Sequence, residues 1–284
     1  MRKDYKILVI NLGSTSTKVA LFSNEQLLFE EKIEHNSKEL SNFNKIIDQY
    51  RFRQNIILNF LKEKGINLST LDAVVGRGRL LRPIASGTYQ VNKKMLEDLR
   101  KGVSGEHASN FGGILVYGIT EKLSTPAYIV DPVVINEMRA IARISGMPEI
   151  PRISILHALN QKAIARKAAL DLGKKYEKAN FIIAHLGGGI SVGIHCKGDI
   201  IDVNNALNGE GPFTPERSGG LPVGALVNLC FSGKFTKDEI LKKIKGKGGL
   251  VAYLNTNDVR EVIKRIEQGE KGKINIGGYG LSSS

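Results

Sequence analysis

The sequence lacks tryptophan altogether and contains two cysteines, Cys196 and Cys230, among 284 residues. The thiols are far apart in the sequence, which argues against a disulfide framework and is typical of a reducing compartment. No pattern of cysteine and histidine has the spacing of a zinc site. No stretch approaches the ~18 consecutive apolar residues of a membrane span, and the amino terminus has no signal-peptide cleavage site. These absences predict a cytoplasmic protein without a membrane partner.

Acidic residues are in short supply, because 28 Asp and Glu face 41 Lys and Arg and leave a net charge of +13. Such a balance is compatible with nucleic-acid binding. The basic residues are spread along the whole chain, however, and the sequence has neither zinc-finger spacing nor an aromatic strand of the RNP type. We therefore expect no nucleic-acid partner and interpret the charge as a lysine-rich surface that suits anionic substrates.

The better-known phosphate loops are also absent, because the sequence has no GxxxxGK[ST] and no GxGxxG that opens a helix after a strand. It contains instead one pattern twice, KILVINLGSTSTKVALF at 6–22 and FIIAHLGGGISVGIH at 181–195. Each copy is an apolar run, a turn of small residues and a second apolar run, and a third run follows. The repeat predicts two three-stranded antiparallel units, at 6–35 and 181–205.

The glycine-rich turns of the two copies correspond to each other. Aligning Gly13 with Gly187 sets Asn11 against His185. A polar turn of this kind can present several backbone N–H groups to one anion, but Gly-Ser turns also serve as plain hairpin connections. Both interpretations are open for a single copy, whereas two matched copies, each with an amide or imidazole side chain before the turn, favour phosphate binding.

Helical and strand patterns alternate in both halves of the chain, which predicts the α/β class. Further strands are expected at 71–78 and 127–134. Helices are expected at 37–64, 91–101, 105–123, 135–145, 154–172, 223–232, 237–245 and 257–268. Residues 202–224, dense in Gly, Pro and Asn, predict a long loop. Pro148 and Pro151 bracket the expected domain boundary, with one domain at 1–148 and the other at 149–284.

Four short motifs place polar side chains in loops at the ends of predicted strands, where α/β proteins carry their chemistry. They are VVGRGRLLRP with Arg77, GEHASN with His107, IVDPVV with Asp131, and GEGPFTPERSGGLPVG with Arg217. Each motif alone is equally compatible with a turn, a solvated arginine or a hydrogen-bonded core histidine. Together they supply positive charge and a single carboxylate, and they contain no HExxH or similar metal pattern.

These stretches closely resemble the butyrate kinases, a group within the acetate kinase family of the sugar kinase, Hsp70 and actin superfamily. The resemblance runs from about residue 5 to about residue 270 and is most specific in the loop at 201–224. The matching segments are INLGSTSTKVALF, GRGRLLRPIASGTY, GEHASNFGG, IVDPVV, ARISG, HALNQKAIAR, AHLGGGISVG, IDVNNALNGEGPFTPERSGGLPVG, LCFSGKFT and GKGGLVAYLNTND.

The resemblance implies a fold of two duplicated RNase H-like (actin-like ATPase) domains with ATP in a cleft between them, which suits the repeat. It implies phosphorylation of butyrate by ATP with Mg²⁺, through direct in-line transfer that yields butyryl phosphate and ADP. It also implies a homo-oligomer. Two alternatives stay open: a kinase for isobutyrate, propionate or acetate, and a non-catalytic remnant that binds phosphate or a partner.

Site residues follow from the same resemblance. Arg77 would hold the substrate carboxylate, Asp131 would orient magnesium or the substrate, and Arg217 would stabilise the migrating phosphoryl group. The implied catalytic residues are Asn11, Arg77, Asp131, His157 and Arg217. The implied substrate-binding residues are Arg77 and His107. The implied nucleotide-binding residues are Ser14, Thr15, Ser16, Thr17, His185, Gly187, Gly188, Gly189 and Ser191. Acetate kinases carry Asn in place of Gly188, so that contact does not transfer.

The chemistry of such a reaction agrees with the residue types present. A carboxylate substrate has a pKa near that of Glu, ~4.3, so it is ionised at neutral pH and needs no general base. It needs relief from repulsion between two anions and in-line positioning. Arginines, magnesium and backbone N–H groups supply that relief, and the planar guanidinium fork matches carboxylate and phosphoryl oxygens.

One departure from the family lies at the carboxyl terminus. Relatives continue well past residue 270 with a helix, a strand that carries a Gly-rich adenosine-binding turn, and closing helices. This chain has KGKINIGGYGLSSS in their place. We therefore expect the second domain to be incomplete, to lack the purine pocket and to bind ATP weakly, with an exposed sheet edge that favours aggregation.

Overall fold

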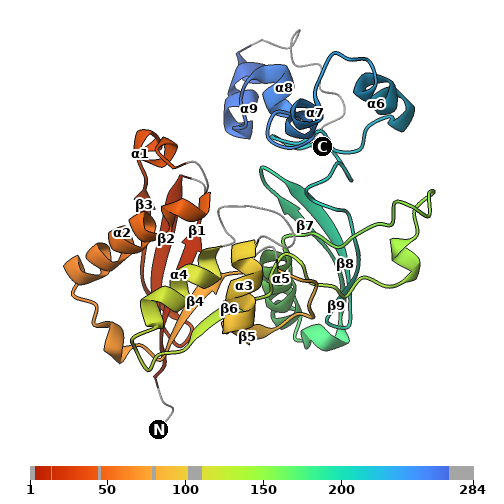
Figure 1. Cartoon of the computed structure of the whole chain (residues 1–284). Helices are drawn as coiled ribbons and strands as arrows, with labels where there is room; N and C mark the ends of the chain where they lie inside the picture. The colour runs from red at the N-terminus through yellow and green to blue at the C-terminus, as the bar shows by residue number, and fades with distance from the viewer. Residues whose placement is uncertain (1–3, 14, 44–45, 79–80, 102–110, 269–284) are drawn as a thin grey trace. The chain divides into compact units, whose positions relative to one another are not determined.

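The computed structural model describes the chain except for residues 1–3, 14, 44–45, 79–80, 102–110 and 269–284 (Figure 1). It divides into two compact units, Met1–Asn136 (unit 1) and Glu137–Ser284 (unit 2). None of the described helices is long and apolar enough to cross a membrane. Each unit has its own sheet, and the two copies of the sequence repeat lie in different sheets.

Unit 1 is built on a sheet with the strand order β3-β2-β1-β4-β6-β5. The strands are β1 (Lys6–Leu12), β2 (Ser16–Ser23), β3 (Gln26–Glu34), β4 (Ala73–Arg77), β5 (Thr88–Gln90) and β6 (Ala127–Val130). β1, β4 and β6 are parallel to one another. The pairs β1–β2, β2–β3 and β5–β6 are antiparallel. The carboxyl ends of three adjacent parallel strands therefore meet at one edge, which is where α/β proteins place functional loops.

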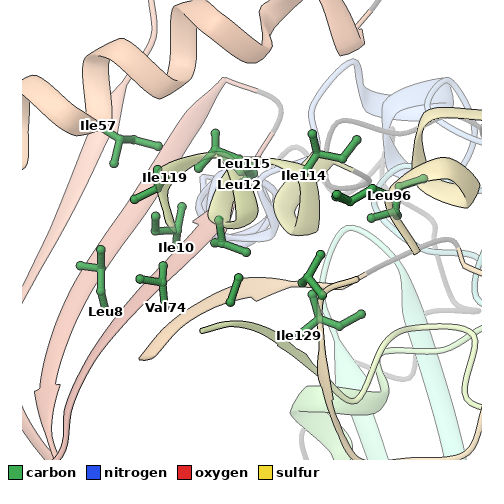
Figure 2. Close-up of a cluster of buried hydrophobic side chains, with 14 of the residues drawn as sticks. Leu8, Ile10, Leu12, Ile57, Val74, Leu96, Ile114, Leu115, Ile119 and Ile129 are labelled. Atoms are coloured by element: carbon green, nitrogen blue, oxygen red, sulfur yellow. The ribbon is translucent and has the colours of Figure 1, made fainter. Parts of the chain in front are cut away.

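The helices of unit 1 are α1 (Ser37–Ser41), α2 (Tyr50–Glu63), α3 (Lys93–Lys101) and α4 (Phe111–Thr120), with 3₁₀ turns η1 (Ile46–Gln49) and η2 (Leu68–Thr70). Every second residue of β1 faces the core, and Leu8, Ile10 and Leu12 are completely buried. Side chains of α2 and α4 complete this cluster, which Figure 2 shows. The alternating burial of β1 is the period of a strand with one face against helices.

Two glycines bring α4 close to the end of β4. A Cβ at Gly76 would lie 2.7 Å from the carbonyl oxygen of Gly112, and a Cβ at Gly112 would overlap the carbonyl oxygen of Arg77. Real side chains do not fit at such distances, so both positions require glycine. The close approach fixes the backbone of Arg77 at the sheet edge.

Unit 2 contains a three-stranded antiparallel sheet of β7 (Asn180–Leu186), β8 (Ile190–Cys196) and β9 (Asp199–Val203). Helix α5 (Ala158–Asp171) packs on β7 through Ala165, Ala169 and Ile183. The remaining helices are α6 (Val223–Cys230), α7 (Lys237–Ile244), α8 (Leu250–Leu254) and α9 (Val259–Glu267), and the 3₁₀ turns are η4 (Ile141–Arg143) and η5 (Tyr176–Lys178). A capping box of Thr236 and Glu239 starts α7.

The predicted pair of three-stranded antiparallel units is confirmed. β1–β2–β3 and β7–β8–β9 have the same order and pairing, and the third strand of each copy carries a one-residue bulge against the second, at Leu28 and at Ile201. The second turn of each copy uses positive φ, at Asn24 in the first and at Lys197 and Gly198 in the second. The duplication therefore extends from sequence to backbone geometry.

The predicted helix at 135–145 is wrong, because only the short turn η4 forms there. The segment instead bonds along β9. The Glu137 carboxylate accepts hydrogen bonds from the Ile200 amide and from the buried Lys162 ammonium at 2.9 and 2.8 Å, and the Arg139 amide donates to Ile201. These tertiary contacts outweigh local helix propensity. They also assign Glu137 to unit 2, ahead of the prolines that mark the boundary expected from the sequence.

Candidate active site

The sheet edge of unit 1 brings together three residues singled out by the sequence. Asn11 lies near the end of β1, Arg77 ends β4, and Asp131 directly follows β6. Arg77 pairs in register with Val130, the residue before Asp131. The Arg77 Nη1 lies 3.4 Å from the Asn11 Oδ1, a long hydrogen bond. The parallel strands thus place an amide, a guanidinium and a carboxylate at one edge.

Arg77 is half-buried, and burial lowers its pKa from the ordinary value because desolvation disfavours the charged form. The guanidinium nevertheless stays protonated at neutral pH. A partly desolvated guanidinium has fewer waters to lose when it binds an anion. Arg77 is therefore suited to hold a carboxylate through two parallel hydrogen bonds.

Asp131 is held in a strained conformation at the same edge. Its φ is +38°, which lies in the left-handed region that side-chain-bearing residues rarely occupy. The Asp131 amide donates to the Gly87 carbonyl at 3.0 Å, and the Gly87 amide donates to the Asp131 Oδ1 at 2.9 Å. This reciprocal pair fixes a carboxylate that is 2% exposed. Backbone strain of this kind costs roughly 1–3 kcal/mol and tends to occur at functional sites.

The β1–β2 turn of unit 1 rests on a buried arginine. Arg53 is completely buried, and its Nη1 donates to the carbonyls of Gly13 and Ser16 at 2.9 and 3.4 Å. The sequence analysis missed Arg53. Its signal was its place in α2, because Arg53, Ile57 and Leu61 occupy one stripe at helical spacing and are the buried residues of that helix. An arginine on an apolar stripe calls for a specific polar partner, which here is the turn.

The remaining turn residues differ in exposure. Thr15 is exposed, and its carbonyl accepts from the His35 amide. Thr17 is completely buried, with its Oγ1 2.8 Å from the His35 Nε2. Burial and, second, the charge of Arg53 lower the pKa of His35 to about 4, so this imidazole is neutral at pH 7. Ser14 lies outside the described residues.

The β7–β8 turn of unit 2, Gly187–Gly189, is covered by the loop that follows β9. The Thr214 hydroxyl donates to the Gly188 carbonyl at 2.6 Å. A Cβ at Gly188 would lie 3.3 Å from the carboxylate carbon of Glu216, whose Oε1 accepts from Asn257. The long loop predicted at 202–224 therefore packs directly on the second glycine-rich turn.

Arg217 lies against the same turn. A Cβ at Gly189 would overlap the guanidinium, so glycine is required there for Arg217 to approach the backbone. The Nη1 of Arg217 donates to the Ala206 carbonyl. Burial lowers the pKa of Arg217, and the nearby Glu216 charge partly opposes that shift. The turn thus has a half-buried positive charge beside its backbone, an arrangement that attracts an anion.

Two histidines and a serine complete the unit 2 site. The rings of His157 and His185 stack with centroids 3.8 Å apart, and the His157 Nδ1 lies 2.8 Å from the Ser191 Oγ. The His185 Nδ1 lies 2.8 Å from the Asn160 Oδ1. Gln161 bonds Ser191 as well. Sequence reasoning missed both amides, although Asn160 and Gln161 stand three and four residues after His157 in HALNQ, on its side of the helix.

The predicted residues therefore form one cluster in each unit. Unit 1 gathers Asn11, Arg77 and Asp131, and unit 2 gathers His157, His185, Gly187, Gly188, Gly189, Ser191 and Arg217. His107, the second predicted substrate-binding residue, lies outside the described residues. Among the described residues, no three His, Cys, Asp or Glu side chains come together as a metal site.

Comparison with known proteins gives strong matches over almost the whole chain. Butyrate kinase 1 of Clostridium acetobutylicum is 57% identical over 267 residues, which are 94% of this chain and 75% of that protein. Butyrate kinase 2 of the same organism is 58% identical over 266 residues, with the same coverage of 94% and 75%. The sequence profile of the acetokinase family matches residues 150–279.

Solved structures agree in fold at low sequence identity. Acetate kinase of Porphyromonas gingivalis aligns with a TM-score of 0.73 and 18% identity, covering 95% of this chain and 75% of that chain. A propionate kinase of Francisella tularensis subsp. tularensis SCHU S4 aligns with a TM-score of 0.72 and 21% identity, at the same coverage. The predicted α/β fold of the actin-like ATPase type is confirmed by these likenesses.

Proposed function

The chain belongs to the acetokinase family, and from this premise we propose that it transfers the γ-phosphoryl group of ATP to butyrate, giving butyryl phosphate and ADP. The observation that carries the proposal is the 57–58% identity with two butyrate kinases over 94% of the chain. The geometry of each site cluster agrees with the two anions that such a reaction handles.

The unit 1 cluster is suited to the acid. Arg77 binds the carboxylate and neutralises part of its charge, and Asn11 orients the guanidinium through the contact between Nη1 and Oδ1. The carboxylate is ionised at neutral pH and attacks without a general base. What the protein contributes is relief of repulsion between the acid and the phosphates, together with in-line positioning.

The unit 2 cluster is suited to the phosphates. The backbone of Gly187–Gly189 offers N–H groups to phosphate oxygens, with Arg217 packed against the turn. As the bond to the leaving oxygen breaks, charge spreads over the equatorial oxygens of the phosphoryl group. Arg217 stabilises that charge. His157 and His185 bind the phosphoryl oxygens beside Arg217.

Asp131 is the residue that would hold Mg²⁺. Its buried carboxylate has one oxygen engaged by the Gly87 amide, and magnesium in kinases is commonly bound by one or two carboxylates together with water and substrate phosphates. A single carboxylate therefore fits the need. When bound, the ion neutralises charge on phosphate oxygens.

The choice of acid is tested by ADP release with butyrate, isobutyrate, propionate and acetate at saturating Mg-ATP. A pocket built for butyrate gains about 1–3 kcal/mol for one methylene, so kcat/KM should fall by roughly tenfold or more from butyrate to propionate and again to acetate. A higher kcat/KM for any other acid would reassign the substrate. Release of ADP that does not depend on any of these acids would contradict a carboxylate kinase.

A further inference from the structure

A buried hydrogen-bond chain runs through unit 2 behind the glycine-rich turn. The Tyr176 hydroxyl lies 2.7 Å from the His195 Nδ1, and the His195 Nε2 lies 3.1 Å from the Gln161 Oε1. The Gln161 Nε2 lies 2.9 Å from both the carbonyl oxygen and the Oγ of Ser191. The chain ends where the Ser191 Oγ meets the His157 Nδ1 at 2.8 Å. Gln161, Ser191 and His195 are all completely buried.

The Ser191 carbonyl oxygen fixes the direction of the bonds from Gln161 through His195 to Tyr176. The carbonyl oxygen of Ser191 can only accept, so the Gln161 atom beside it must be the amide nitrogen. The amide oxygen then faces His195, whose Nε2 must carry a proton to donate to it. In the neutral ring the His195 Nδ1 is therefore an acceptor, and the Tyr176 hydroxyl donates its hydrogen bond to it. Burial independently keeps His195 neutral, since it lowers the pKa of this imidazole to about 4.

The Ser191 hydroxyl sets the position of the His157 ring proton. The Ser191 Oγ receives one N–H from Gln161 at 2.9 Å and one from the His157 backbone at 3.4 Å. A hydroxyl has two acceptor positions and one proton. Both acceptor positions are taken, so the hydroxyl proton points at the His157 Nδ1. That nitrogen is an acceptor, and the ring proton of neutral His157 resides on Nε2.

We propose that Gln161 is a positioning residue whose buried amide holds His157 as the neutral tautomer protonated at Nε2. The consequence for catalysis rests on the proposed function, in which His157 contacts phosphoryl oxygens. Phosphoryl oxygens only accept hydrogen bonds, so the Nε2–H tautomer presents the group that they need. A second proton on Nδ1 would meet a hydroxyl whose acceptor positions are already filled.

Gly193 makes room for the amide. A Cβ at this position of β8 would overlap the Gln161 Oε1. Gly193→Ala should therefore displace the Gln161 side chain without changing Gln161 itself. Gly224 offers a matched control, because a Cβ there meets nothing within 4 Å.

The test is the protonation of the His157 ring nitrogens, read by ¹⁵N–¹H NMR of the full chain labelled at histidine, with His157→Asn to assign the signals. Wild type should show a protonated Nε2 and an unprotonated Nδ1 at neutral pH. Gln161→Leu and Gly193→Ala should give averaged shifts from a mixture of tautomers, whereas Gly224→Ala should match wild type. A wild-type spectrum with the proton on Nδ1 overturns the proposal even if no variant folds. So does a folded Gln161→Leu that retains the pure Nε2–H form.

Kinetics separate this proposal from the proposed function. Gln161→Leu should lower kcat for butyrate-dependent ADP release by up to ~100-fold. KM for ATP and for butyrate should stay nearly unchanged, because the substrates still bind but His157 is misaligned with the phosphoryl group. Loss of affinity at unchanged kcat would contradict the positioning role. A wild-type protein with the Nε2–H tautomer but no butyrate-dependent turnover would refute the function alone. Full turnover with the Nδ1–H tautomer would refute the positioning alone.

Discussion

Arg77 and Arg217 lie in different units, yet burial lowers the pKa of both guanidinium groups because desolvation disfavours their charge. Both remain protonated, since arginine keeps its proton in proteins. A desolvated, permanently charged fork binds carboxylate or phosphoryl oxygens strongly, because little water competes for it. Replacing either arginine by alanine should therefore impair the reaction, through kcat for Arg217 and through KM for butyrate for Arg77.

Arg217→Ala should lower kcat by roughly 10³-fold and change KM little, as expected for an arginine that stabilises phosphoryl charge in the transition state. Steady-state ADP release with butyrate measures both parameters. Arg260→Ala is the matched control, because the Arg260 side chain is 90% exposed and pairs with Asp258, two residues away in the sequence. A near-normal kcat in the Arg217 variant would refute its role.

Arg77→Ala should instead raise KM for butyrate, because the substrate carboxylate loses its binding partner before the chemical step. Initial rates over a range of butyrate concentrations at saturating ATP provide the measurement. Arg77→Lys keeps the charge but not the planar fork, so it should restore only part of the affinity. An unchanged KM for butyrate in Arg77→Ala would show that another group holds the acid.

The buried imidazole of His195 should make unit 2 less stable in acid. Its pKa is about 4 in the folded protein against 6.5 for the free side chain. Between these two pKa values the unfolded chain binds a proton at His195 and the folded chain does not. The full free energy of unfolding is therefore present above about pH 6.5, and part of it is lost as the pH falls toward about 4. The loss should reach about 2–3 kcal/mol for this group.

Urea unfolding at about pH 7.5 and about pH 4.5 measures that loss, with m-values checked for two-state behaviour. In His195→Gln the difference in unfolding free energy between the two pH values should shrink, because the variant has no group to titrate there. His35 has a similarly lowered pKa in unit 1, so part of the pH dependence should persist. An identical pH dependence in wild type and variant would contradict the buried neutral imidazole.

At the scale of elements, the strand–turn–strand copies were predictable because a strand with one buried face requires apolar residues at every second position. Leu8, Ile10 and Leu12 show that period directly. The helix expected at 135–145 did not form because the Glu137 carboxylate and the Arg139 amide bond to β9, contacts that no local pattern reveals.

The partners of the side chains that support the site from behind could not be predicted from the sequence. Gln161 bonds across 30 residues to Ser191, and Arg53 bonds across 40 residues to Gly13. Such pairings depend on where separate elements pack, which the spacing of residues does not encode. The motifs proposed to carry the chemistry could be predicted from the sequence because their residue types cluster within short loops, and their catalytic roles stay predictions.

The β1–β2 turn should depend on its helical support. Arg53→Met should destabilise the protein by about 2–4 kcal/mol, because it removes a buried guanidinium that donates to the part-buried carbonyls of Gly13 and Ser16. Chemical denaturation measures the change. Arg51→Ala, on the exposed face of the same helix, should cost less than about 0.5 kcal/mol. Equal stability of the two variants would show that Arg53 does not support the turn.

At the scale of the whole molecule, the duplicated fold gives each unit one glycine-rich turn and one buried or half-buried arginine near it. Unit 1 has Arg53 beneath its turn, and unit 2 has Arg217 against its own. Positive charge and backbone N–H groups in both units suit a reaction between two anions. The +13 net charge of the chain suits anionic substrates.

The most direct test is identification of the product. Wild-type protein mixed with Mg-ATP and butyrate should form butyryl phosphate and ADP in a one-to-one ratio, followed together by ³¹P NMR, and omission of butyrate should abolish both signals. Arg217→Ala should form neither at a comparable rate. Formation of ADP and inorganic phosphate without an acyl phosphate signal, or ADP release that is independent of butyrate, would contradict direct phosphoryl transfer to the acid.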